Sequence, residues 1–308
     1  MRYISLGTSG LRVSAVGLGC NELGRSVGLE QARGVVDAAL DAGITLFDTA
    51  DVYGDSESVL GECLRGRREH AVLATKFGHQ RMTMGYGPAA GARGGRAYIR
   101  RAVEGSLRRL RTDHIDLYQI HTPDPHTPVE ETLAALTELV REGKVRYIGN
   151  SNFAGWQIAE AACAARSGGF EPFVSAQNHW SLLERDIEAE VVPAARHFGL
   201  GVLPYFPLAN GLLTGKVRRG RPIPEGTRIA DSAHRVTKER LDVVEALAAW
   251  GARNGRSLLE IAVGGLAALP GCSSVIAGAT RPEQVKANAA AGAWTPTAEE
   301  LREILALL

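Results

Sequence analysis

Four polar residues in the first 121 positions carry the side chains that acid–base chemistry needs: Asp48, Tyr53, Lys76 and His121. Asp48 and Lys76 could form a buried ion pair, and Tyr53, five residues past Asp48, could reach the same place. A lysine ammonium close to a phenol favours the phenolate. We therefore expect the pKa of Tyr53 to fall from about 10 toward the working range of a general acid. His121 could then help to orient a carbonyl oxygen between its imidazole and the phenol.

Several other catalytic and phosphate-binding motifs are missing. The sequence has no His-x-His or H-E-x-x-H pattern, so we expect no metal site, and no G-x-S-x-G turn to support serine acyl transfer. Glu22 stands where a dinucleotide fingerprint beginning at Gly17 needs a third glycine, and Gly215-Lys216 lacks the flanking residues of a P-loop. Acid–base catalysis is the chemistry that remains, and any cofactor site is expected to differ from that of a Rossmann domain.

Short apolar strands and amphipathic helices alternate along the chain and must position these residues. Regular βα alternation predicts a parallel sheet, and eight units fit a closed (β/α)8 TIM barrel better than an open sheet. We expect one domain over residues 1–308, opened by a hairpin (Tyr3–Leu6 and Leu11–Ser14) and closed by a C-terminal helix (Glu299–Leu308). The strands are expected at Val16–Gly19, Thr45–Asp48, Val72–Lys76, Ile115–His121, Val145–Ser151, Phe173–Gln177, Gly201–Tyr205 and Ser274–Ala277, and the helices at Leu29–Ala42, Glu57–Leu64, Tyr98–Leu110, Val129–Val140, Trp156–Ala165, Ile187–Phe198 and Leu258–Leu269.

Polar side chains end six of these strands. Reacting groups of (β/α)8 proteins lie at the C-terminal ends of the strands, so these side chains should meet at the barrel mouth. Any single one could instead cap a strand or bond to a loop, but that explanation is weak for the whole set. Two long loops, 78–96 and 208–233, follow strands and should also lie at the mouth. The strand-end residues are Asp48, Lys76, His121, Ser151-Asn152, Gln177 and Tyr205.

Composition narrows the choice of partners. Thirty-five basic and 34 acidic residues give a formal charge of +1, which offers no basic footprint for nucleic acid or an anionic membrane. The N-terminal residues lack the apolar core of a secretion signal, no segment approaches a membrane span, and the four widely spaced cysteines suggest reduced, mostly buried thiols. We expect a cytoplasmic protein that acts on a small molecule.

Five segments that span nearly the whole chain match one known family in their order: 46–54, 74–76, 116–121, 149–153 and 211–216. In these segments the chain resembles the aldo-keto reductase superfamily, and most closely its bacterial members and the potassium-channel β-subunit-like branch. The resemblance implies hydride transfer from NADPH to an aldehyde or ketone, with Asp48, Tyr53, Lys76 and His121 as the catalytic tetrad and Tyr53 as the proton donor.

The resemblance also implies how the chain binds its cofactor. Ile276–Pro282 runs from the last strand into a helix, and a helix N-terminus after a late barrel strand is a common phosphate site. The implied contacts are Ser151, Asn152 and Gln177 on the nicotinamide carboxamide; Tyr205 stacked on the nicotinamide ring; Leu208, Gly211 and Leu212 along the pyrophosphate; and Gly278, Thr280, Arg281, Gln284 and Asn288 around the adenosine 2'-phosphate and adenine.

Three departures from the family pattern limit what carries over. Phe206 replaces a small polar residue and Ala287 an acidic one, which puts cofactor affinity and the preference for NADPH over NADH in question. His179-Trp180 stands where a tyrosine is usual, and a change of packing is the favoured interpretation.

Alternatives remain open at this stage. The chain could be a nucleotide-sensing subunit with slow turnover, or a dehydrogenase that works mainly toward alcohol oxidation. Cys20–Leu23, Tyr53, Phe77–Met84, Trp180 and the segment after Tyr205 should form the pocket walls and suit a small or medium apolar carbonyl, although a sugar or secondary-metabolite ketone would also be compatible. A homo-oligomer is compatible with the sequence, which does not determine the oligomeric state.

Overall fold

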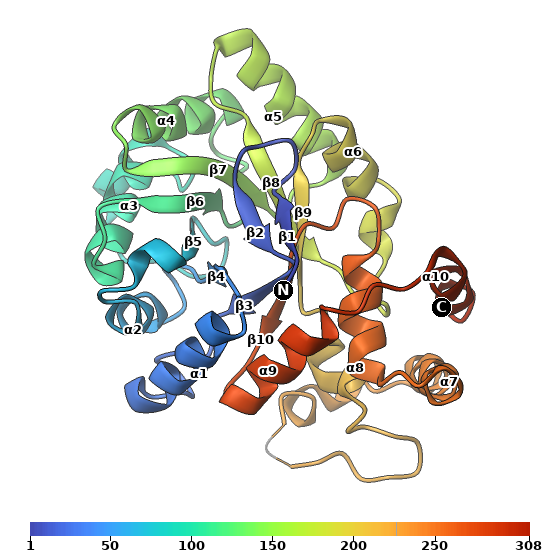
Figure 1. Cartoon of the computed structure of the whole chain (residues 1–308). Coiled ribbons are helices and arrows are strands. Elements are labelled where there is room, and N and C mark those ends of the chain that lie inside the picture. The colour runs from blue at the N-terminus through green and yellow to red at the C-terminus, as the bar shows by residue number, and fades with distance from the viewer. Residues whose placement is uncertain (226) are drawn as a thin grey trace.

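A closed barrel of parallel strands lies at the centre of the molecule (Figure 1). The computed structural model describes residues 1–225 and 227–308, without the side chains at 231 and 232; Gly226, in the expected mouth loop, lies outside the described residues. The strand order β10-β3-β4-β5-β6-β7-β8-β9 closes because β10 pairs with both β3 and β9. The barrel strands are β3 (Val16–Gly19), β4 (Leu46–Asp48), β5 (Val72–Phe77), β6 (Ile115–Ile120), β7 (Val145–Ser151), β8 (Phe173–His179), β9 (Gly201–Tyr205) and β10 (Val275–Gly278).

Helices surround the barrel, as the βα alternation predicts (Figure 1). The longer helices bury a stripe of apolar side chains; in α4, Leu133, Leu136 and Leu139 are fully buried. The expected (β/α)8 barrel is confirmed, and its strand ends fall within two residues of the expected positions. The helices are α1 (Leu29–Asp41), α2 (Ser56–Cys63), α3 (Arg96–Leu110), α4 (Val129–Arg141), α5 (Gly155–Gly168), α6 (Val191–His197), α7 (Lys238–Asn254), α8 (Leu258–Glu260), α9 (Pro282–Ala291) and α10 (Ala298–Leu305).

The expected N-terminal hairpin, β1 (Tyr3–Ser5) and β2 (Arg12–Ser14), lies across one end of the barrel (Figure 1). Leu6, Leu11 and Val13 form one buried cluster with barrel residues such as Leu46 and Leu117. Asp48, Lys76 and His121 follow farther along the same strands, toward their C-terminal ends. The hairpin therefore covers the barrel end opposite the polar strand ends.

The helix α7 was not anticipated from the sequence. Its boundaries are nevertheless marked: the Thr237 side chain accepts a hydrogen bond from Arg240 N at 3.3 Å, and Gly255 ends the helix with φ 65°. Trp250 of α7 donates to Glu303 of α10 at 2.7 Å, and both helices bury residues in a second apolar cluster. The expected C-terminal helix is confirmed as α10, and it packs against the outer helices.

Two expected helices are shorter or less regular than the sequence pattern suggested. The segment expected to be helical over 187–198 has a 3-10 turn at Asp186–Glu188, followed by α6, whose Pro193 lies in the first turn, where its missing N–H is tolerated. The segment 258–269 begins as α8 and continues as a π-helical turn at Ile261–Gly265.

No helix in residues 1–225 and 227–308 combines the length and apolar character that crossing a bilayer requires. The thiols of Cys20, Cys63 and Cys272 are buried and unbridged, whereas Cys163 on α5 is exposed. The expectation that most of the thiols are buried is thus confirmed.

Candidate active site

Lys76 and Asp48 form the buried ion pair that the sequence predicted. Lys76 is fully buried, and its Nζ donates to Asp48 Oδ1 at 2.8 Å, to Asp48 Oδ2 at 2.7 Å and to the Thr49 carbonyl at 2.8 Å. Burial alone would lower the pKa of Lys76, but the charge and hydrogen bonds of Asp48 hold that pKa above its usual value. The ammonium therefore remains a fixed positive charge at the barrel mouth.

Tyr53 lies beside this pair and faces His121. The Tyr53 hydroxyl is 3.5 Å from His121 Nε2, and the two rings meet edge to face with their centroids 5.6 Å apart. Lys76 Nζ lies 5.3 Å from the centroid of the Tyr53 ring. The structure thus brings the four predicted acid–base residues together at one place.

The expected lowering of the Tyr53 pKa is wrong. Burial raises the pKa of Tyr53 above its usual value, and the charge of Lys76 offsets only part of that rise. The geometry gives a reason, because Lys76 directs its N–H groups at Asp48 and Thr49, and the negative charges of Asp48 and Asp51 raise the pKa of Tyr53 further. Tyr53 is therefore protonated at neutral pH.

His121 is a neutral imidazole in this environment. Burial, together with the nearby charge of Lys76 and the neighbouring His79, lowers the pKa of His121 to about 2. Its Nδ1 is buried and has no hydrogen-bond partner among the residues that the structure describes. His121 can thus serve as a neutral hydrogen-bonding group through Nε2, the nitrogen that faces Tyr53.

The residues expected to bind a nicotinamide carboxamide connect directly to these four. Gln177 Nε2 donates to Asp48 Oδ1 at 2.8 Å, and Ser151 Oγ donates to the Gln177 carbonyl at 2.9 Å. Asn152 donates from Nδ2 to the His121 carbonyl at 2.9 Å and accepts from the Tyr205 hydroxyl at 2.8 Å. Asn152 adopts φ 61°, a left-handed conformation that is uncommon for non-glycine residues, although asparagine tolerates it better than most. The strand ends therefore form one hydrogen-bonded unit.

The loop after β9 is unusually rich in left-handed backbone. Phe206, Ala209 and Asn210 have φ of 53°, 47° and 58°, and Gly211 has φ 108°. Leu212 is fully buried in the second apolar cluster, so only its backbone can face the mouth. Strain of this kind is typical of ligand-binding loops and needs surrounding packing to hold it in place.

The segment that follows β10 has an open, polar surface. A Cβ built on Gly278 would have the Gly19 carbonyl as its nearest atom, 3.9 Å away, so a ligand can approach the backbone closely. The Gln284 side chain accepts from Thr280 N at 2.8 Å and from Arg281 N at 3.2 Å, which shapes the start of α9. Arg281 is exposed and, within the described residues, forms no ion pair. Asn288 is buried about two turns farther along α9. A cationic side chain at a helix start beside accessible backbone suits a phosphate group.

Comparisons with known proteins agree with this geometry. The model of the family described as "Aldo/keto reductase family" matches residues 15–308. The chain belongs to the aldo/keto reductase family. It is 42% identical over 93% of its length to an uncharacterized oxidoreductase, YrpG, of Bacillus subtilis (strain 168), of which it covers 89%.

Two further relatives are 35% identical to the chain. One is the aldo-keto reductase YhdN of Bacillus subtilis (strain 168), over 100% of this chain and 94% of the relative; the other is a probable voltage-gated potassium channel subunit beta of Oryza sativa subsp. japonica, over 94% and 90%. The resemblance stated from the sequence is thus confirmed. As a member of this family, the chain is an oxidoreductase that acts on carbonyl compounds. The family generally uses nicotinamide cofactors.

Part of the expected pocket wall of this aldo/keto reductase is wrong. Cys20, Phe77 and Trp180 are buried in the main core cluster instead of facing the mouth. Phe77 stacks on Tyr118 at 4.8 Å, and Trp180 donates from Nε1 to Glu188 at 2.9 Å. These contacts support the interpretation of Trp180 as a large packing residue whose indole N–H forms a hydrogen bond.

Two histidines at the mouth received no stacking or hydrogen-bonding role from the sequence, although His179 was noted as a departure from the family pattern and His79 lies in the expected pocket wall. The His179 ring lies parallel to Tyr205, 5.4 Å away, and the His79 ring packs edge to face on His121 at 4.7 Å. Arg228 bonds to Glu22 and lies 5.7 Å from the Phe206 ring, and so connects the loops after β9 and β3. The position of these residues at or after the ends of barrel strands was a signal that the sequence offered.

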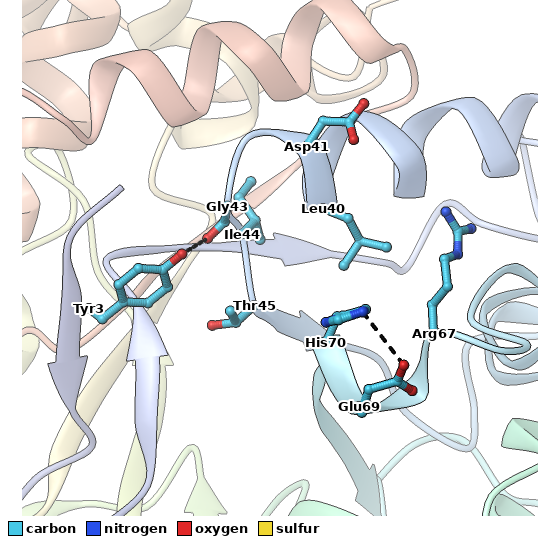
Figure 2. A pocket seen from close by; sticks show the side chains of 9 residues that line it. All are labelled: Tyr3, Leu40, Asp41, Gly43, Ile44, Thr45, Arg67, Glu69 and His70. Atoms are coloured by element: carbon cyan, nitrogen blue, oxygen red, sulfur yellow. Dashed lines mark hydrogen bonds and ion pairs between the residues drawn. The ribbon is translucent and has the colours of Figure 1, made fainter.

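A separate cavity of about 560 Å³ opens at the other end of the barrel (Figure 2). The Tyr3 hydroxyl donates to the Gly43 carbonyl at 3.1 Å, and His70 faces Glu69 at 3.5 Å. Thr45, also in its wall, precedes β4, whereas Asp48 is the last residue of that strand. This cavity is therefore distinct from the candidate active site.

Proposed function

We propose that the protein is an NADPH-dependent reductase that converts an aldehyde or ketone into an alcohol, with Tyr53 as the general acid. The observation that carries this proposal is the pairing of the Tyr53 hydroxyl with His121 Nε2 at 3.5 Å beside the buried Lys76–Asp48 pair. These groups provide two hydrogen-bonding positions for one carbonyl oxygen. Bound NADPH would supply the hydride.

Tyr53 and His121 hold the carbonyl oxygen from two sides. His121 donates from Nε2, since its low pKa keeps the ring neutral and leaves the proton on Tyr53 as the one to transfer. As negative charge develops on the oxygen, the Tyr53 proton moves to it and the phenolate forms within reach of the Lys76 charge. Asp48 keeps that ammonium in place by binding it through both carboxylate oxygens.

Other residues of the chain position the cofactor. Tyr205 would stack on the nicotinamide, with its ring fixed by the hydrogen bond to Asn152 and by His179 on one side. Gln177 has its Nε2 committed to Asp48, so its Oε1 would accept a carboxamide N–H. Leu208, Gly211 and Leu212 would present backbone to the pyrophosphate, and Arg281 with Thr280 would bind the 2'-phosphate. This last contact is the basis for assigning NADPH and not NADH.

A second candidate function is a nucleotide-sensing subunit with slow turnover. The observation in its favour is the 35% identity to a probable voltage-gated potassium channel subunit beta over nearly the whole chain. The same four acid–base residues would be present in such a subunit, so only the rate of turnover separates the two functions.

The test is NADPH oxidation with a reactive aldehyde such as 4-nitrobenzaldehyde, followed by the loss of NADPH absorbance. Wild type, Tyr53→Phe and Tyr3→Phe are compared after fluorescence titration confirms that each binds NADPH. Tyr3 is a matched control, because its hydroxyl bonds to Gly43 at the opposite end of the barrel.

Turnover that is lost in Tyr53→Phe and retained in Tyr3→Phe would establish the reductase and its acid. If wild type binds NADPH but reduces none of a varied set of carbonyls, the sensing function replaces the reductase. Full activity of Tyr53→Phe would refute the role of Tyr53.

A further inference from the structure

His79 lies beside the place where the proposed reaction occurs, without belonging to the four acid–base residues. It follows Gly78, which leaves β5 with φ 75°, and its ring is half-exposed at the mouth. The His79 and His121 ring centroids are 4.7 Å apart at an interplanar angle of 80°. The His121 ring thus contacts the rings of both Tyr53 and His79.

The backbone of the same loop fixes which nitrogen of His79 carries the proton. His79 Nδ1 accepts hydrogen bonds from Arg81 N at 3.1 Å and from Met82 N at 3.2 Å. A nitrogen that accepts two N–H groups must be unprotonated, so a neutral His79 carries its hydrogen on Nε2. Burial and the charges of Arg93 and Arg81 also lower the pKa of His79, which favours this neutral form.

The resulting Nε2–H is a hydrogen-bond donor without an assigned acceptor. Among the residues that the structure describes, none accepts a hydrogen bond from His79 Nε2. A donor held in one tautomer on a half-exposed ring is already oriented for a ligand, so little conformational entropy is lost when the ligand binds. Its immediate neighbour is the imidazole to which we assign the reacting carbonyl oxygen.

We propose that His79 donates a hydrogen bond from Nε2 to a second substrate oxygen on the carbon next to the reacting carbonyl. The pocket would then favour 2-hydroxyaldehydes and 2-oxoaldehydes over aldehydes of the same size without that oxygen. This proposal rests on the proposed function, because it takes the carbonyl oxygen to lie between Tyr53 and His121. A neutral N–H donor can bind a hydroxyl or carbonyl oxygen, so the substrate needs no carboxylate.

Two substitutions of His79 distinguish recognition of the second substrate oxygen from the effect of His79 on the conformation of its own loop. His79→Phe keeps a ring against His121 but removes both nitrogens. His79→Asn retains an oxygen that can accept from the Arg81 and Met82 amides and a shorter N–H donor. His126→Phe is the matched control, since His126 is exposed on the next strand-to-helix loop and its backbone N–H, not its ring, bonds to Asp124.

Steady-state kinetics with glyceraldehyde and propanal measure the selectivity. We expect His79→Phe to lower kcat/KM for glyceraldehyde about 10-fold, the effect of one net hydrogen bond, and kcat/KM for propanal less than about 3-fold. His79→Asn should recover part of the preference, and His126→Phe should leave it unchanged. An equal loss for both aldehydes in His79→Phe would overturn the proposal.

A second readout does not depend on turnover. The ¹⁵N resonances of the His79 ring are recorded in the protein saturated with NADP+, with the assignment taken from His79→Phe. We expect the Nε2–H tautomer, and a shift of Nε2 with glyceraldehyde but not with propanal.

If wild type reduces neither aldehyde, the proposed function fails, while this titration still decides whether His79 recognises the second oxygen. A protonated Nδ1, or equal shifts with both ligands, would refute the assignment.

Discussion

Gln177 donates its amide N–H to the same oxygen of Asp48 that accepts from Lys76, and both distances are 2.8 Å. The residue expected to hold the nicotinamide carboxamide thus also holds the carboxylate that anchors the ammonium. All three side chains are buried, so each contact forms in a poorly hydrated environment where an unpaired group is costly. Positioning of the cofactor and of the acid–base residues is coupled through Asp48.

Gln177→Glu should therefore destabilise the protein more than Gln177→Met. Met removes one hydrogen bond at a cost of about 1 kcal/mol, whereas Glu places a second carboxylate beside Asp48 and should cost about 2 kcal/mol more at neutral pH. Since the crowded Glu would have a raised pKa, its extra cost should shrink as the pH falls. Urea unfolding of both variants at about pH 5 and about pH 8 measures this difference; equal curves at the higher pH would contradict it.

Asp48→Asn should leave the Lys76 ammonium buried without its counter-charge. We expect about 3 kcal/mol of lost stability and a lowered pKa of Lys76, because removing one partner of a buried pair leaves the other uncompensated. Adding Lys76→Met to this variant should restore part of the loss. The measurement is the free energy of unfolding of the two single variants and the double variant; purely additive losses would show that the pair is not coupled.

Asp51 should make the protein less stable as the pH rises. Both of its carboxylate oxygens are buried without a partner among the described residues, and burial, reinforced by the charge of Glu57, raises the pKa of Asp51 to about 7. Arg109 and Lys76 oppose this shift. From about pH 4 to about pH 7 the folded chain keeps a proton that the unfolded chain has released, so this group's contribution to stability falls across that range.

The variant Asp51→Asn removes that dependence. As the pH rises from about 4 to about 8, the free energy of unfolding of this variant should increase relative to that of wild type by up to about 4 kcal/mol. Most of this increase should be reached by about pH 7. Thermal unfolding of both proteins across this range measures the gain, and Asp41→Asn, at an exposed carboxylate at the end of α1, serves as the control. A constant difference between wild type and Asp51→Asn at every pH would contradict the raised pKa.

Arg281→Ala should weaken NADPH binding more than NADH binding. Loss of one charge-assisted contact to the 2'-phosphate predicts an approximately 10-fold to 100-fold rise in the Kd for NADPH and little change for NADH. Fluorescence titration with each nucleotide measures both constants, and Arg253→Ala, on the outer helix α7, controls for loss of a surface charge. Equal effects on both nucleotides would place the 2'-phosphate elsewhere.

The sequence predicted those features that depend on local pattern and on the barrel's symmetry. The regular alternation of eight strands with helices predicted the barrel, and because the strand ends converge, Asp48, Lys76 and His121 could be placed together before the structure was known. The helix α7 was overlooked because its apolar residues follow a long irregular segment, although Thr237 and Gly255 mark its ends.

Properties that depend on three-dimensional packing could not be predicted from the sequence pattern. The pKa of Tyr53 depends on a balance between burial and the charge of Lys76, and the spacing of the two residues shows only the second. The Gln177–Asp48 contact joins residues 129 positions apart, and the protonation of His79 depends on the path of a loop backbone. Loop conformations of this kind follow no periodic pattern.

The hairpin that covers the lower end of the barrel has a practical consequence. Because Leu6, Leu11 and Val13 are buried against the barrel strands, the start of the chain is held on the face opposite the mouth. A fusion partner joined at Met1, or attachment of that end to a sensor surface, would leave the mouth turned toward the surrounding solution. An immobilised form of the protein should be built from this end.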